Sequence, residues 1–173
     1  MKKLSILFLS TFLVLSSCSK DDGPLQIDGN IVGTWNMVDY DYSGQTSTTF
    51  DGQTINTNFV AEAFNMDYQL VFSEDPKTYT SSGSFDVRLT TTINGQTQTQ
   101  TTSIDDVFGT GTWDIDGSTI SFDPSDMEAS SGTIVALNDT TLILSVKEEE
   151  DFSQSGATIK TTLEARITFE RVE

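Results

Sequence analysis

Residues 163–170 read LEARITFE, and their alternation decides the fold class. From Leu163 to Phe169 every second residue is apolar, and the residues between them are charged or carry a hydroxyl. Because successive side chains of a β-strand point to opposite faces, this segment buries one face and leaves the other in water. The stretch therefore predicts a β-sheet with one apolar side and one polar side.

The same alternation recurs along the rest of residues 31–173. Residues 68–72 and 85–93 place their large apolar side chains on one side, and residues 113–122 do so across a tight turn. Turn signals separate the runs at intervals of roughly twenty residues. They are Asp51-Gly52, Asp75-Pro76, Asn94-Gly95, Asp116-Gly117, Asn138-Asp139 and Ser155-Gly156. The pattern predicts about eight to ten antiparallel strands in a sandwich or a closed barrel.

Three segments depart from this pattern. Residues 96–103 are nearly all Thr and Gln, so we expect an exposed edge strand or a protruding hairpin. Residues 103–108 and 124–129 are expected to form short helical turns, since Pro124 suits the first position of a helix.

The N-terminus reads as an export signal. Lys2 and Lys3 precede an apolar run over residues 4–15 that is too short to span a bilayer. The run ends in Leu15-Ser16-Ser17-Cys18, which resembles the lipobox of bacterial lipoproteins. The resemblance implies a signal peptide over residues 1–17 and attachment of lipid, including acyl chains such as palmitate, to Cys18. The alternative is an ordinary secretory signal whose small residues precede a cysteine.

Residues 18–30 are predicted to form a flexible tether. Within it, Ser19-Lys20-Asp21-Asp22 is similar to the lysine-plus-acid signal that directs Bacteroidota lipoproteins to the outer face of the outer membrane. Glycine and proline residues in the same stretch favour an extended, mobile chain. We therefore expect a membrane-anchored protein at the outer membrane that faces the exterior, with the periplasmic face as the alternative.

Length and charge narrow the classes of partner. Removal of the first 17 of the 173 residues leaves 156, which fits one domain. The formal charge is −17, and it becomes −19 once Lys2 and Lys3 leave with the signal. Nucleic acid is excluded as a partner, because phosphate binding depends on Lys and Arg.

Two Gly-x-Trp motifs give the domain a family resemblance. Gly33-Thr34-Trp35 resembles the start of the first barrel strand in lipocalins, and Gly111-Thr112-Trp113 and the terminal strand ending in Arg171-Val172 strengthen the likeness. The arrangement is similar to the lipocalin-like domain of many Bacteroidota lipoproteins. It implies an antiparallel meander β-barrel over residues 31–173.

The resemblance also implies a barrel floor in which an Arg of the last strand packs on the first-strand Trp. Arg171 shares the inward face of its strand with Phe169, whereas Arg166 points outward, so Arg171 is the expected partner of Trp35. The alternative role for Trp35 is stacking on a ligand.

The residue inventory limits the chemistry. Because the chain has no His and Cys18 is its one thiol, His-based triads, Cys-His dyads and His-bearing zinc sites are excluded. Asp114 and Asp116, like Asp123, Asp126 and Glu128, lack the spacing of a calcium loop. Residues 148–151 are expected to form a solvated acidic loop. We expect no enzyme, metal or cofactor, with a carboxylate-pair glycosidase as the alternative.

Two functions from different classes remain. The first is a binding module for a small hydrophobic or amphipathic ligand, with a filled core as the opposing interpretation of the same inward side chains. Its expected lining is Phe72, Phe85, Leu89, Trp113, Leu142 and Leu144. The second is a structural or interaction lipoprotein with a filled barrel, whose loops bind a protein or glycan. Exposed aromatics such as Phe59, Phe64 or Tyr79 would favour the second.

Overall fold

The computed structural model describes residues 26–105, 107–126, 130–154 and 156–173, which form ten β-strands. The strands are β1 (Gln26–Ile27), β2 (Gly33–Phe50), β3 (Gln53–Glu74), β4 (Lys77–Ile93), β5 (Gln96–Asp105), β6 (Thr110–Asp116), β7 (Thr119–Pro124), β8 (Ser130–Leu137), β9 (Thr141–Gln154) and β10 (Ala157–Arg171). Their Thr, Val, Ile and aromatic residues suit a pleated, half-buried surface. No helix in these ranges is long and apolar enough to cross a bilayer.

Eight of the described strands close a ring. Hydrogen-bonded neighbours follow the order β8-β7-β6-β4-β3-β2-β10-β9, and β8 also pairs with β9, which completes the circuit. All of these pairings are antiparallel. Neighbours in the ring are mostly neighbours in the chain, so the predicted all-β meander barrel is confirmed.

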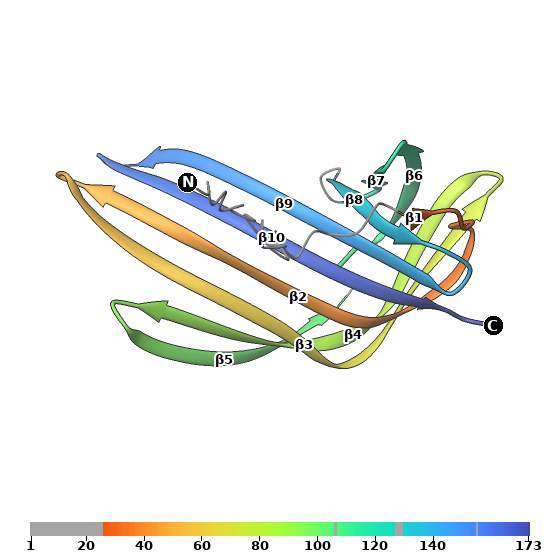
Figure 1. The fold of residues 1–173 in the computed structure, drawn as a ribbon, viewed down its shortest axis with the longest axis horizontal. Helices are drawn as coiled ribbons and strands as arrows, with labels where there is room; N and C mark the ends of the chain where they lie inside the picture. Colours follow the sequence, from red (N-terminus) through yellow and green to blue (C-terminus); the bar gives the residue numbers. More distant parts are fainter. Residues whose placement is uncertain (1–25, 106, 127–129, 155) are drawn as a thin grey trace, which may run out of the picture.

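The ring closes over only part of its longest strands (Figure 1). Beyond it, six strands continue as an open sheet in the order β5-β4-β3-β2-β10-β9, which we call the wing. The wing comprises residues 42–50, 53–61, 87–93, 96–104, 146–154 and 157–165. In Figure 1 it extends to the left, past β6, β7 and β8 at the right. Its two edges are β5 and the distal part of β9.

Two β-bulges lie between the ring and the wing. In β2 the extra residue is Val38, after which Tyr40 rather than Asp39 faces inward. In β3 the register shifts between Phe64 and Asp67. Because side chains alternate along a strand, a shift of one residue exchanges its inward and outward sets. The bulges thus keep the apolar face inside along strands that are too long for one uninterrupted alternation.

Residues 26–30, predicted to end a flexible tether, belong to the folded domain. β1 pairs in parallel with the end of β8, and the amides of Asp28 and Gly29 both donate to the carbonyl of Leu137 at 3.0 Å. Gly29 runs so close to the backbone of Asn138 that a Cβ at this position would overlap it. The domain therefore begins before residue 31, and the predicted boundary is corrected.

Three local predictions can be compared with the strands. The helical turns are wrong where their residues are described, because residues 103–105 pair with β4 and Pro124 pairs with β6. The exposed edge over residues 96–103 is confirmed, since β5 pairs with β4 alone among the described strands. The acidic residues 148–151 lie in strand β9 instead of a loop, where they pair with β10.

Gly83 gives a test of the junction between ring and wing. It pairs with Tyr68 beside the β3 bulge, has a φ of 100°, and a Cβ on it would overlap the carbonyl oxygen of Asp67. We expect Gly83→Ala to lower the free energy of unfolding by about 3 kcal/mol, measured by urea denaturation. Gly52→Ala is the matched control, because Gly52 has a φ of 76° in a turn with open space around it. It should cost only about 1 kcal/mol, and equal losses for the two variants would contradict the packing described here.

Candidate binding site

Arg171 and Trp35 close the end of the barrel at which β10 finishes. The guanidinium carbon lies 4.2 Å from the centroid of the indole ring, a cation–π contact. The guanidinium nitrogens also donate to the backbone carbonyls of Asp139, Val32 and Asn30, the first two at 2.8 Å. Trp35 has no exposed surface, so it belongs to the floor rather than to a ligand site. One side chain therefore ties the end of β10 to two other backbone segments, residues 30–32 and the turn at Asp139.

The ring above this floor is filled by its own side chains. Phe72, Phe85, Trp113 and Leu142, all predicted to line a pocket, are buried in the core. Phe72 meets the ring of Trp113 edge-on, with 5.8 Å between centroids. Of the other two predicted lining residues, Leu89 is half-buried in the wing and Leu144 borders the cavity described below. Tight aromatic packing of this kind is usual in small barrels.

Phe108 packs into the ring at the boundary with the wing. The amide of Phe108 donates to the hydroxyl of Tyr68 at 3.1 Å, and its carbonyl accepts from the hydroxyl of Tyr79 at 2.9 Å. The Phe108 ring packs on Phe122, with 5.1 Å between centroids. Two buried tyrosines thus hold an apolar side chain over the filled part of the barrel.

A cavity of about 280 Å³ lies beside Phe108, where the ring opens between β8 and β9. Its lining comes from β2 (Tyr40), β7 (Phe122), β8 (Ser130, Ser131, Gly132), β9 (Leu144, Val146, Glu148), β10 (Leu163, Ala165, Ile167) and the segment before β6 (Val107, Phe108). Most of these side chains are apolar. The polar groups are the hydroxyls of Tyr40, Ser130 and Ser131 and the carboxylate of Glu148. An apolar cavity with a few polar groups is the usual form of a small-molecule site.

Tyr40 and Glu148 are the ionisable side chains of the lining. The Tyr40 ring packs edge-on against Phe85, with 5.5 Å between centroids. Burial raises the pKa of Tyr40 to about 12, and the neighbouring Tyr42 and Glu148 add to the rise. The Tyr40 hydroxyl is therefore neutral at physiological pH, whereas the exposed Glu148 brings a carboxylate to the rim.

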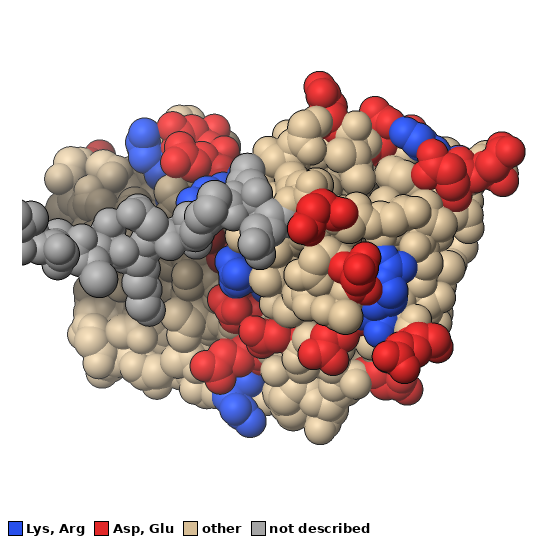
Figure 2. Space-filling view, turned by 45° about the vertical axis from the view of Figure 1, so that its right-hand side comes forward, with Lys and Arg blue, Asp and Glu red and all other residues tan. Residues whose placement is uncertain are grey.

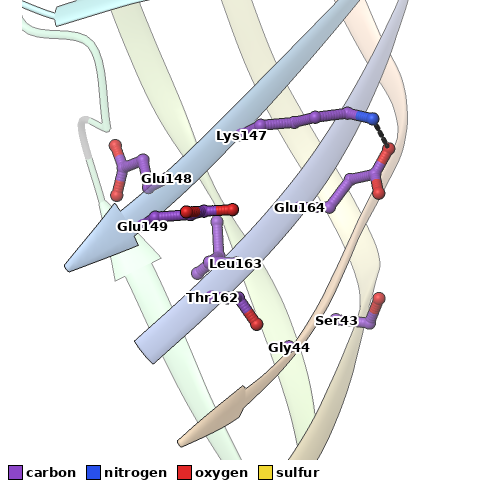
Figure 3. Close-up of a pocket in the computed structure, with 8 residues that line it drawn as sticks. All are labelled: Ser43, Gly44, Lys147, Glu148, Glu149, Thr162, Leu163 and Glu164. Carbon is purple, nitrogen blue, oxygen red and sulfur yellow. Dashed lines mark ion pairs between the residues drawn. The ribbon is translucent and has the colours of Figure 1, made fainter. Parts of the chain in front are cut away.

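A second hollow, of about 260 Å³, lies across β9, β10 and β2 (Figure 3). It contains an ion pair in which Lys147 Nζ lies 3.1 Å from Glu164 Oε1. Both side chains are mostly exposed. Such an exposed pair contributes little free energy, and the remaining lining is mostly polar or charged. The apolar cavity beside Phe108 is therefore the stronger candidate site.

The acidic residues considered for a metal do not form a set of ligands in the described part of the chain. Among the described residues no three His, Cys, Asp or Glu side chains are grouped so that they could hold a metal ion. Asp114 instead pairs with Lys77 at 2.9 Å, which lowers the pKa of Asp114 and raises that of Lys77. Asp116 ends β6, Asp123 lies in β7, and Glu128 falls outside the described residues.

The residues predicted for lipid attachment and sorting lie before the described part of the chain. Cys18, Lys20, Asp21 and Asp22 all fall within residues 1–25. Their proposed roles stay predictions from the sequence.

Several cavity residues were missed by the sequence prediction. Tyr40 was hidden by the bulge at Val38, which reverses the alternation that starts at Trp35. Phe108 fell in a segment predicted as a helical turn. Ala165 did lie on a predicted inward face. Its small side chain, between the larger Leu163 and Ile167 on the same face, was the one sign in the sequence of unfilled space inside the barrel.

The comparisons with known proteins give one family. A family model described as a lipocalin-like domain matches residues 31–144. No curated protein matches the chain. Among solved structures, the chain is similar to the crystal structure of Ail, the attachment invasion locus protein of Yersinia pestis, at 8% sequence identity over 80% of this chain and 99% of that chain, with a TM-score of 0.25. A TM-score of 0.25 does not show that the two proteins share a fold.

The raised pKa of Tyr40 predicts a loss of stability at alkaline pH. The unfolded chain releases this proton near pH 10, whereas the folded chain holds it to about 12. The contribution of Tyr40 to the free energy of unfolding is therefore fully present below pH 10, and it is lost as the pH rises from 10 to 12. Relative to Tyr40→Phe, the native chain should lose about 2 kcal/mol of unfolding free energy between pH 10 and 12. Tyr42→Phe, which removes a tyrosine whose pKa is raised less, should change the profile less, and identical profiles for all three proteins would contradict the burial of Tyr40.

Proposed function

This chain belongs to the lipocalin-like domain family, and we propose that it is a lipid-anchored protein whose barrel binds a small hydrophobic or amphipathic ligand beside Phe108. The observation that carries the proposal is the apolar cavity of about 280 Å³ at the open side of the ring. Its volume lies just below the usual range for ligand sites, so it suits a small molecule or one end of a longer one. The inner face of the wing continues from the cavity and offers room for the rest.

The position of β1 supports an anchor at the floor end of the barrel. Only residues 19–25 separate the proposed lipidated cysteine from Gln26, so the anchor lies within about 27 Å of β1 even if that segment is fully extended. β1 pairs with the last residues of β8, on the same side as Arg171. The cavity would then open away from the bilayer, where it would meet ligands from the aqueous side.

A second candidate function rests on the tip of the wing. Phe50, Ile55, Ile93 and Phe152 are exposed there, and the alternation places all of them on the inner face. Exposed apolar groups gathered on one face are typical of a contact surface. The aromatics predicted for this role do not form it, since Tyr79 is buried and Phe59 and Phe64 are half-buried. The wing tip therefore favours an interaction lipoprotein as the alternative.

A neutral fluorophore and a blocked cavity distinguish the two functions. We expect N-phenylnaphthylamine to bind the Cys18→Ser chain with a rise in fluorescence, and Val146→Trp to abolish the rise, because the indole would occupy the cavity that Val146 borders. Val60→Trp is the matched control, since Val60 is exposed on the outer face of β3. It should leave binding unchanged.

Thermal unfolding of each variant shows whether it is folded before binding is compared. Equal binding by the native barrel and by folded Val146→Trp would contradict the proposed cavity. Absence of any binding to the native barrel would leave the wing tip as the better supported site.

The anchor is tested separately by metabolic labelling with palmitate in a Bacteroidota host. We expect label on the native chain and none on Cys18→Ser, because that thiol would receive the diacylglycerol. Replacement of Lys20, Asp21 and Asp22 by Ala should retain the label but protect the chain from protease added to intact cells. Label on Cys18→Ser would refute the attachment site, and unchanged protease sensitivity would refute the sorting signal.

A further inference from the structure

The charge at the rim of the cavity points to the class of ligand. We infer that the cavity selects amphiphiles with a cationic head group, such as an alkylammonium, whose apolar part enters beside Phe108 while the head group pairs with Glu148. The inference rests on the proposed function, because it assumes that the cavity binds a ligand. Three observations support it: the side of β9 on which Glu148 lies, the absence of a competing cation in the lining, and the sign of the overall field.

Glu148 lies on the inner side of β9, unlike the residues next to it. It follows Leu144 and Val146 at two-residue spacing, and all three border the cavity. Figure 3 shows the Glu148 side chain on the opposite side of β9 from Lys147, which turns toward Glu164. Its cross-strand partner in β10 is Leu163, an apolar member of the lining.

The described lining contains no Lys or Arg that would neutralise this carboxylate. Lys147 lines the second hollow together with Glu148, but its ammonium is paired with Glu164 at 3.1 Å, and Lys160 is paired with Asp151 at 3.0 Å. Arg166 lies between the inward residues Ala165 and Ile167 and therefore points to the outer face. A ligand cation would thus meet a carboxylate that forms no ion pair with another described residue.

The order of side chains sets the orientation of such a ligand. Val146 and Ala165 lie on the ring side of Glu148 and provide apolar surface for an alkyl chain. Glu150 follows on the same face of β9, toward the wing tip. The head group would therefore stay at the hydrated rim, where a cation keeps part of its water.

The overall charge acts in the same direction. The chain carries 26 acidic and 9 basic residues, and Figure 2 shows carboxylates spread across the barrel, with only a few Lys and Arg beside them. A field of this sign raises the local concentration of cations and repels fatty-acid anions. The field favours any cation, whereas Glu148 would fix where the cation binds.

Three ligands of equal chain length test the inference. Decylammonium, decanol and decanoate are titrated, below the concentrations at which they aggregate, against N-phenylnaphthylamine bound to the Cys18→Ser chain. We expect decylammonium to displace the dye at about fivefold lower concentration than decanol, the upper range for an exposed ion pair, and decanoate to be weakest. Glu148→Gln should bring decylammonium to within about twofold of decanol without changing decanol itself. Glu149→Gln removes the same charge from the next residue of the strand and should retain the preference.

The outcomes distinguish a failure of the proposed binding function from a failure of the inferred selectivity for cations. If the dye and all three ligands fail to bind, the proposed binding function fails. If decanol and decylammonium bind equally, or if Glu148→Gln retains the preference, the selectivity inference is overturned and the binding function stands. Equal loss in Glu148→Gln and Glu149→Gln would also overturn it, since the preference would then come from net charge alone.

Discussion

The length over which β8 pairs with β9 controls the rest of this structure. β8 runs antiparallel to β9, and its pairing towards the mouth stops at Thr133, opposite Ser145, whereas β9 continues to Gln154. A barrel removes its strand edges only where it is closed. Beyond Ser145 the barrel therefore opens, β9 becomes an edge strand, and the cavity beside Phe108 lies at the opening. The floor end stays closed, so one set of strands provides both a filled core and an accessible mouth.

The acidic run of β9 follows from this early end of closure. An unpaired edge invites association with other strands, and charged side chains discourage it. Because side chains alternate, the run at residues 148–151 places Glu149 and Asp151 on the outer face and Glu148 and Glu150 on the inner face. The outer carboxylates join the hydrated surface, and Asp151 pairs with Lys160 there. The inner ones charge the approach to an otherwise apolar cavity, so protection of the edge and the polarity of the mouth come from the same four residues.

The features that could be predicted from the sequence were the β-strands and the contact that closes the barrel floor. Alternation identified the strands, and the family resemblance, together with the inward position of Arg171 on its strand, pointed to the contact of Arg171 with Trp35. The cavity was not predictable in the same way, because it depends on where pairing between strands stops. The bulge at Val38 reversed the face of Tyr40, and Phe108 is held by hydroxyls from distant strands. Neither feature leaves a periodic signal in the chain.

Residue-resolved amide hydrogen exchange of β9 tests the end of closure most directly. Where β9 lies between β8 and β10, at residues 142–145, successive amides should all be protected. Along residues 146–153, where only β10 is paired, protection should alternate, because every second amide of an edge strand points away from its single neighbour. Uniform protection through residue 153 would mean that the barrel closes along its whole length, and it would contradict the open mouth on which the binding site depends.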